Sequence, residues 1–183
     1  RRRDLESIDH LLVLGCGTSL HAGEMGARYL RQLCDFVTVQ TVDAAEFSVD
    51  LIPRSSPKVG AVLLSQSGET ADLQRCLSVL RVHRVFTIGV INVRDSLVAR
   101  AVDCGIYLNA GREVGVASTK SFVSQCAAMA MLAMWFGQVH RPEKQGITTR
   151  LKVAADLRQL SAHIHAVLDG LPPKIQQLAP LFD

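Results

Sequence analysis

The stretch VGAVLLSQSGETADLQ, residues 59–74, decides the fold class because it passes from a strand to a helix through one polar loop. Val59 to Leu64 is an unbroken apolar run of strand length, and from about Thr70 to Arg84 the apolar residues recur with a helical period. A continuously apolar strand next to a helix is typical of a parallel sheet that is buried on both faces. The stretch therefore predicts one strand-loop-helix unit of such a sheet.

The same alternation runs through most of the chain and predicts the α/β class. Four further strands are expected at Leu11 to Leu14, Phe36 to Thr41, Val85 to Ile91 and Gly105 to Leu108. Other helices are expected at about Thr18 to Leu33, Ala44 to Val49 and Ser96 to Ala101, and a buried helix at Ser121 to Val139. Together they predict a parallel sheet covered by helices on both faces.

A helical extension is expected beyond this sheet domain. We place the domain at residues 1–140 and the extension at 141–183. The extension is predicted as two helices, Leu151 to Leu168 and Lys174 to Ala179, separated by a stop at Pro172 and Pro173. We expect it to pack on a neighbouring domain outside this chain.

Composition limits the partners and the cellular setting. The 183 residues suffice for one domain with a sizeable core. Lys and Arg number 20 against 17 for Asp and Glu, and three arginines at the start account for the excess, so we expect neither nucleic acid nor a membrane as partner. The longest continuously apolar run, Cys126 to Phe136, is shorter than the roughly 20 residues that span a bilayer. The five cysteines are odd in number and widely spaced, which predicts no disulfide framework, no metal site and a reducing, cytoplasmic setting.

Three loops at strand ends are rich in Gly, Ser and Thr: GCGTS (15–19), SQSGET (65–70) and NAGREVGVASTK (109–120). In an open parallel sheet, ligands bind outside the carboxyl ends of the strands. Ser and Thr hydroxyls, backbone N–H groups and helix N-termini can bind a phosphate without Lys or Arg. Gly68 allows a close backbone approach, and Gln66 would suit the hydroxyls of a sugar. The loops therefore predict an anion site, and SQSGET is its centre.

These loops admit other interpretations. Ser65 or Ser67 could be an ordinary cap of the helix that follows. A dinucleotide site is disfavoured because Leu20 stands where the third glycine of GxGxxG should be, and no Gly-x4-Gly-Lys-Ser/Thr occurs. Glu69 could be a general base, but a carboxylate in a first helical turn is favoured by the helix dipole. Glu113 and Lys120 flank the third loop as an ion pair, a loop anchor or a catalytic pair.

Three motifs in this order, CGTS (16–19), SQSGETAD (65–72) and GVASTK (115–120), resemble one family. The chain is similar to the first sugar isomerase (SIS) domain of the glutamine–fructose-6-phosphate aminotransferases, the glucosamine-6-phosphate synthases. The resemblance extends from about Ile8 through Gln125 and more loosely to the end. It implies a five-stranded parallel sheet in a three-layer α/β/α sandwich of flavodoxin-like type, with a C-terminal helical extension and no cofactor.

The resemblance also implies a ligand, fructose 6-phosphate or glucosamine 6-phosphate, and the residues that bind it. Carried over by position, the substrate-binding residues are Thr18, Ser19, Ser65, Gln66, Ser67, Thr70, Val116 and Ser118. The SQSGET side chains would hold the phosphate, and Thr18 and Ser19 would reach the phosphate and the sugar. Val116, through its backbone, and Ser118 would contact the other end of the sugar.

No catalytic residue is expected in this chain. In the family, the glutaminase nucleophile, the Schiff-base lysine, the proton-transferring carboxylate and the ring-opening histidine belong to the glutaminase domain, the second SIS domain and the C-terminal tail. The resemblance therefore implies a fragment that is inactive alone and forms a homodimer. INVRDS (91–96) departs from the family, since Arg94 and Asp95 stand where a small Gly/Ser turn is usual. Two alternatives stay open: a non-catalytic phosphosugar-sensing module, and a stand-alone dimeric aldose–ketose isomerase with Glu69 or Glu113 as base.

Overall fold

The sheet of this protein is parallel throughout, and the fold belongs to the predicted α/β class. The structure is a computed structural model that describes residues 2–53, 58–115, 117–140 and 144–182. In this part of the chain the strands are β1 His10–Gly15, β2 Thr38–Asp43, β3 Val59–Ser65, β4 Phe86–Ile91 and β5 Cys104–Tyr107. Their order is β2-β1-β3-β4-β5, and every neighbouring pair is parallel. The sheet therefore grows in opposite directions from β1 and β3, which makes the gap between these two strands the switch point of the topology.

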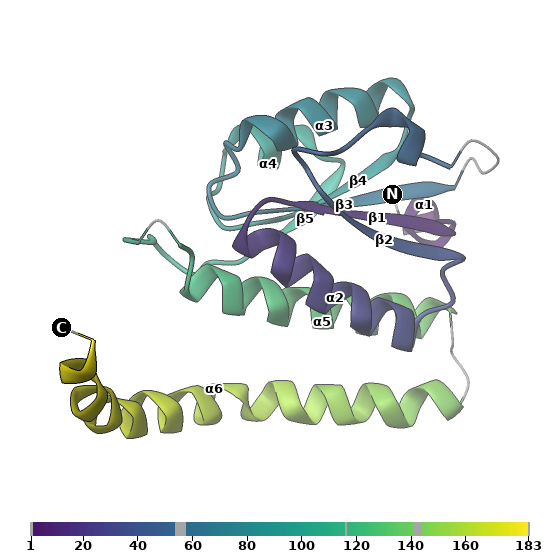
Figure 1. The fold of residues 1–183 in the computed structure, drawn as a ribbon. Coiled ribbons are helices and arrows are strands. Elements are labelled where there is room, and N and C mark those ends of the chain that lie inside the picture. Colours follow the sequence, from purple (N-terminus) through teal and green to yellow (C-terminus); the bar gives the residue numbers. More distant parts are fainter. Residues whose placement is uncertain (1, 54–57, 116, 141–143, 183) are drawn as a thin grey trace.

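Helices cover both faces of the sheet, as the sequence predicts. They are α1 Arg2–Glu6, α2 Thr18–Leu33, α3 Ala71–Val82, α4 Leu97–Ala101, α5 Lys120–His140 and α6 Lys144–Leu178, with short 3-10 turns η1 Val49–Leu51 and η2 Ala179–Leu181. Figure 1 shows α2 and α5 on one face of the sheet, α3 and α4 on the other, and α6 running outside α2 and α5. The three-layer α/β/α sandwich with a C-terminal helix is thus confirmed.

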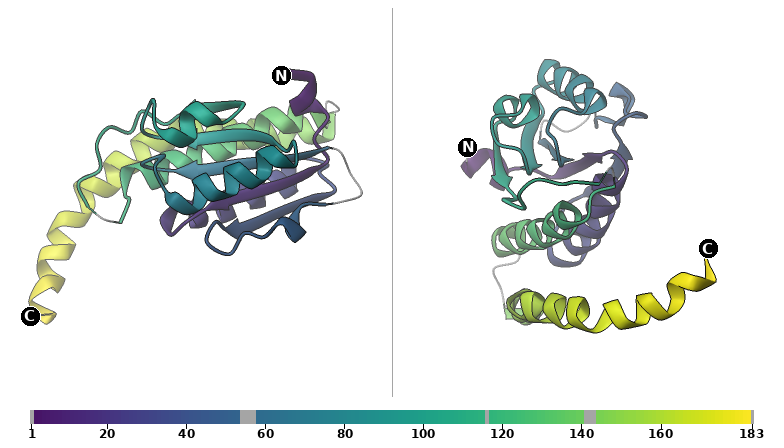
Figure 2. Two further views of the ribbon diagram at one scale, coloured as in Figure 1. Left: turned by 90° about the horizontal axis from the view of Figure 1, so that it is seen from above. Right: turned by 90° about the vertical axis from the view of Figure 1, so that its left-hand side faces the viewer.

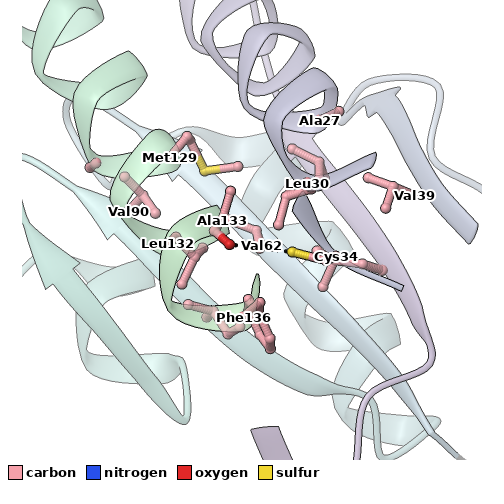
Figure 3. Close-up of a cluster of buried hydrophobic side chains, with 14 of the residues drawn as sticks. Ala27, Leu30, Cys34, Val39, Val62, Val90, Met129, Leu132, Ala133 and Phe136 are labelled. Atoms are coloured by element: carbon pink, nitrogen blue, oxygen red, sulfur yellow. Dashed lines mark hydrogen bonds between the residues drawn. The ribbon is translucent and has the colours of Figure 1, made fainter. Parts of the chain in front are cut away.

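The core over the α2 and α5 face depends on a close approach of these two helices. A Cβ on Gly26 of α2 would lie 2.6 Å from side-chain atoms of Met129 of α5, so glycine is what allows the helices to touch. Figure 3 shows Met129, Leu132 and Phe136 of α5 gathered with Leu30 of α2 above the sheet. Because β-strand side chains alternate between faces, one set of strand residues fills this core and the other set fills the core under α3 and α4.

The long apolar helix α5 belongs to the interior. Among the described residues, it is the one helix whose length and composition would let it cross a membrane. Its fully buried residues Met129, Ala133 and Phe136 pack in the core over the sheet. The interior helix that the sequence predicts at Ser121 to Val139 is therefore present, one residue longer at each end.

The C-terminal extension differs from the prediction of two helices. It is one helix, α6, which contains Pro172 and Pro173 in its interior. A proline in a helix removes one backbone donor and crowds the carbonyl four residues before it, which either kinks or breaks the helix, and here α6 continues. Figure 2 shows α6 curving over its C-terminal part.

Part of α6 packs on this chain rather than elsewhere. Arg150 donates from Nη1 to the carbonyl of Gly137 at the end of α5, at 2.9 Å. Leu157 and Leu160 share a groove with Tyr29 of α2 and Cys126 of α5. From His165 onward every residue that the structure describes is exposed. The expectation that the extension packs outside this chain is therefore wrong for the first half of the helix.

The short helix predicted at Ala44 to Val49 is also wrong. The chain makes a turn after β2 and then the 3-10 turn η1. Asp43 accepts the N–H of Ala45 on its side-chain Oδ1 at 2.9 Å, and its carbonyl accepts the N–H of Glu46 at 3.0 Å. This local side-chain bond stabilises a turn in place of the first helical turn.

Candidate functional site

Three polar loops meet at the carboxyl edge of the sheet and enclose a pocket of about 440 Å³. It is lined by Cys16, Gly17, Thr18, Ser19, Leu64, Ser65, Gln66, Ser67, Thr70, Ala117 and Ser118. Every predicted substrate-binding residue that the structure describes is in this lining. Val116, the remaining one, lies outside the described residues. The pocket sits at the switch point, because two of its three loops follow β1 and β3.

The SQSGET loop is held in shape by two of its own serines. Ser65 Oγ accepts the backbone N–H of Gly68 at 2.9 Å, and Ser67 Oγ accepts the N–H of Glu69 at 3.1 Å. Ser65 Oγ also lies 3.3 Å from Thr70 Oγ1, in a contact where either hydroxyl can donate. A hydroxyl that accepts from an N–H keeps its own proton to donate. The loop therefore offers hydroxyl protons toward the pocket, which suits an anion.

These bonds differ from an ordinary helix cap. The N-cap of α3 is Thr70, and its side chain makes no capping bond. Neither Ser65 nor Ser67 accepts an N–H of the helix itself, because both serve the loop before it. The first N–H groups of α3 thus have no side-chain cap in the described residues, and such groups attract anions.

Gly68 and Glu69 join this loop to the next one. Gly68 has φ +66°, and its carbonyl accepts the N–H of Val98 in α4 at 3.0 Å. Glu69 Oε1 accepts the N–H of Leu97, the first residue of α4, at 2.9 Å. The sequence predicted Glu69 in the first turn of the helix after SQSGET. It instead lies before α3 and binds the start of α4, where its charge is favoured in the same way.

Asn92 ties the third loop to the sheet, and sequence reasoning missed it. It directly follows β4 and is 8% exposed. Its Nδ2 donates to the carbonyl of Gly111 and its Oδ1 accepts the N–H of Ala110, both at 2.8 Å. A buried side-chain amide that bonds backbone in two directions fixes the course of a loop. An asparagine immediately after an apolar strand was the available signal.

Glu113 anchors the same loop to the start of α5. Its Oε1 accepts the backbone N–H of Ser121 at 2.8 Å, the Ser121 hydroxyl at 2.9 Å and the N–H of Thr119 at 2.9 Å. Lys120 donates from Nζ to the carbonyl of Arg112 at 2.7 Å. Of the roles weighed for this pair, the contacts favour the loop anchor. The backbone N–H of Ser121 is the main cause that holds the pKa of the Glu113 carboxyl below its ordinary value of 4.5.

The depressed pKa of Glu113 predicts a pH-dependent contribution to stability. A carboxyl whose pKa is lower in the folded state stabilises the fold above its unfolded pKa, and this contribution is lost as pH falls through the folded pKa. The Glu113→Gln variant should therefore melt below the parent near neutral pH, and the gap should narrow as pH falls below 4.5. Thermal melts across this range measure it, with the exposed Glu46→Gln as control. A gap that stays constant with pH would contradict the prediction.

Arg94 and Asp95 lie outside the main pocket. Arg94 donates from Nη2 to Asn109 Oδ1 at 2.9 Å, and its guanidinium carbon is 5.6 Å from the centre of the Tyr107 ring. Asp95 has φ +60°, the left-handed conformation that a Gly would take most easily. With Arg112, Arg94 lines a second hollow of about 490 Å³ that shares Gln66 with the first. Arg94 of INVRDS thus belongs to the lining of the neighbouring hollow.

Helix ends supply the positive potential of the main pocket. Thr18 and Ser19 are in the first turn of α2, Thr70 is the N-cap of α3, and Ser118 lies just before α5. No charged side chain is among the described residues that line the pocket. Burial is the main cause that raises the pKa of the Cys16 thiol, so it stays protonated and is a poor nucleophile. The described part of the site can bind an anion and offers it no carboxylate, imidazole or amine as acid or base.

A flavodoxin-like sheet with this pocket at its switch point defines the class: an α/β protein that binds small ligands at its strand ends. Residues 4–135 match the SIS domain family, and the chain belongs to that family.

Its relatives are aminotransferases. A probable glutamine–fructose-6-phosphate aminotransferase (isomerizing) of Acanthamoeba polyphaga mimivirus is 50% identical over 127 residues, which are 69% of this chain and 21% of the relative. Glutamine–fructose-6-phosphate aminotransferase (isomerizing) 2 of Bos taurus is 33% identical over 181 residues, 97% of this chain and 25% of the relative. The chain thus spans about a quarter of the length of these curated relatives.

A solved structure agrees with this assignment. The C-terminal domain of glucosamine-fructose-6-phosphate aminotransferase from Francisella tularensis superposes with a TM-score of 0.88 at 26% identity. The superposition covers 99% of this chain and 50% of that one. The resemblance stated from three motifs is thereby confirmed at the level of the family.

Proposed function

We propose that this chain is the first SIS domain of a glutamine–fructose-6-phosphate aminotransferase and binds fructose 6-phosphate and glucosamine 6-phosphate. The observation that carries the proposal is the pocket of hydroxyls at the switch point, where the motifs of all three loops come together. Relatives named for this reaction match the chain over most of its length. The product would serve hexosamine synthesis in the cytoplasm.

The chemistry of the pocket supports a sugar phosphate more than other anions. The hydroxyls of Ser65, Ser67 and Thr70 and the free N–H groups of α3 would hold the phosphate. Thr18 and Ser19 would reach the phosphate and the sugar, with Gln66 assisting. Ser118, and Val116 through its backbone, would contact the far end of the sugar. A pocket of about 440 Å³ has room for a hexose phosphate.

Catalysis is proposed to lie outside this chain. Glu69 and Glu113, the bases considered for a stand-alone isomerase, each bind backbone N–H groups as anchors, and neither lines the pocket. Lys120 is bonded to a backbone carbonyl, so it is a poor candidate for a Schiff base. We propose that a glutaminase domain and a second SIS domain in the same protein supply the reactive groups, and that the isolated chain is inactive.

This proposal also implies how the domains of the chain are organised. Residues 1–140 would form the SIS domain and 141–183 the extension toward the second SIS domain. The exposed second half of α6 supports this role, because its apolar residues Val167, Leu168 and Ile175 are each more than half exposed in the described chain. We further propose that the protein assembles as a homodimer.

Titration of the 183-residue chain with glucosamine 6-phosphate tests the proposal. NMR spectra should show saturable shifts in the amides of residues 65–70 at or below millimolar ligand. Glucosamine and inorganic phosphate, each carrying half of the ligand's chemistry, should bind more weakly than the sugar phosphate. Absence of binding at millimolar ligand, with the chain folded, would count against the proposal.

A second candidate is a phosphosugar-sensing module that binds the same ligand without serving a reaction. The described pocket lining has no charged side chain, and this observation favours a sensing module as much as it favours the substrate-binding half of an enzyme. The two candidate functions can be distinguished in the full protein that contains this chain. If a pocket variant that loses ligand affinity also lowers the synthesis of glucosamine 6-phosphate from fructose 6-phosphate and glutamine, the sensing role is excluded.

A further inference from the structure

Gln125 carries a buried side-chain amide next to the pocket. A contribution to the stability of the fold does not explain why this amide is there. Gln125 lies in α5 and is 0% exposed. Its Nε2 donates to Ser19 Oγ at 3.0 Å, and its Oε1 has no hydrogen-bond partner in the part of the chain that the structure describes. A buried carbonyl oxygen without a donor disfavours the folded state. A methionine of similar length would fill the same space without that cost.

The packing of α2 and α5 fixes where this amide lies. Ser19 and Gly26 are seven positions apart on α2 and share one face, and Gln125 and Met129 are one turn apart on α5. Gly26 lets the two helices touch at Met129. The same close approach brings the buried Gln125 within hydrogen-bond distance of the buried Ser19.

The contact determines what the Ser19 hydroxyl can do. Because Ser19 Oγ accepts a hydrogen bond from the amide N–H, its own proton is left to be donated in another direction. Ser19 is 6% exposed, and it lines the pocket beside Thr18 and Ser65. A donor in this place suits an oxygen of a phosphate or a sugar. A freely rotating hydroxyl would spend part of its time pointing elsewhere.

We propose that Gln125 is a positioning residue that fixes the Ser19 hydroxyl as a hydrogen-bond donor to the bound sugar phosphate. The proposal rests on the proposed function for the identity of the ligand. It makes Gln125 part of the binding machinery although it does not line the pocket. It also explains the orphaned oxygen, because the amide is retained for its N–H group alone.

Gln125→Met separates this role from a structural one, because the two roles predict opposite changes. As a positioning residue, its loss should weaken glucosamine 6-phosphate binding roughly three- to tenfold, about the effect of one hydrogen bond. The melting temperature should stay level or rise, since the orphaned oxygen is gone. A mere link between helices would instead lower the melting temperature and leave the affinity unchanged.

A double-mutant cycle with Ser19→Ala isolates the coupling. In the Ser19→Ala background, Gln125→Met should cause no further loss of affinity. Gln138→Met, at an exposed position on the same helix, is the matched control and should match the parent. Gln125→Leu replaces the methionine variant if the latter does not fold. Affinity within twofold of the parent, or losses that simply add, would overturn the proposal.

A measurement without ligand keeps the proposal separate from the proposed function. NMR couplings between the α and β protons of Ser19 report its side-chain rotamer in the unliganded chain. We expect one rotamer in the parent and averaging in Gln125→Met. If the parent binds no sugar phosphate, the proposed function fails while this averaging still supports the positioning of Ser19. The same single rotamer in both proteins would overturn the inference in either case.

Discussion

The Gly68→Ala variant should lose roughly 2 to 5 kcal/mol of unfolding free energy, measured by urea denaturation. Two causes add. The residue has φ +66°, where an L side chain is strained. Its Cβ would also overlap Ser96 Oγ and lie 2.6 Å from Ser96 Cβ and 3.0 Å from Ile91 Cγ2. Ser96 is buried and donates to the carbonyl of Val93, so it has no easy way to yield.

Gly170→Ala is the control for this variant. Gly170 lies in α6, where a Cβ would meet nothing within 4 Å, so alanine should be neutral or stabilise the helix by up to about 1 kcal/mol. Adding Ser96→Gly to Gly68→Ala should recover the part of the loss due to overlap and leave the part due to φ. Parent-like stability of Gly68→Ala alone would show that the SQSGET loop can move away from α4.

The Ser67→Ala variant should weaken binding of glucosamine 6-phosphate by about 1 to 3 kcal/mol, as titration calorimetry can measure. Ser67 Oγ already accepts the N–H of Glu69, so its proton is the group offered to the phosphate. Removing it leaves a phosphate oxygen short of one donor in a pocket whose described lining has no charged side chain to compensate. The N–H of Glu69 is released at the same time, which keeps the loss from being larger.

Ser78→Ala provides the matched comparison on α3. Ser78 is exposed and its hydroxyl donates to the carbonyl of Gln74 within the helix, away from the pocket. Its loss should leave the affinity unchanged. If Ser67→Ala binds as well as Ser78→Ala, the hydroxyl of Ser67 does not contact the ligand, and the proposed role of the SQSGET loop must be revised.

The sheet and the members of the pocket could be predicted because they depend on local patterns. Val59 to Leu64 is apolar on both faces, as is typical of an interior parallel strand, and the helix from Thr18 to Leu33 has the predicted limits. The carboxyl ends of parallel strands share one edge, so loops far apart in the sequence are expected on the same side of the sheet. That geometry predicted that the loops gather at one edge, and the family resemblance selected Ser19, Ser65 and Ser118 within them; all three line one pocket.

The contacts that organise the site could not be predicted, because they join residues far apart or depend on backbone angles. Glu69 binds the start of α4 only because Gly68 turns the chain at positive φ. Asn92 bonds backbone 18 and 19 residues later, and Gln125 meets Ser19 across 106 residues. Pro172 and Pro173 indicated a stop, yet α6 continues through them. Sequence patterns predict helices and strands, but they do not tell which side chains of different elements meet.

The described pocket lining has no charged side chain, and this affects how the affinity for a phosphorylated ligand would respond to salt and pH. A site built on Lys or Arg attracts anions from a distance and weakens steeply with salt. Here the described lining holds hydroxyls, an amide and a thiol that stays protonated, so no protein group in it changes charge near neutrality. For fructose 6-phosphate, which has no amine, the pH dependence of binding would then follow the second ionisation of the phosphate ester itself, at about pH 6. The ligand, rather than the protein, would carry the titrating group.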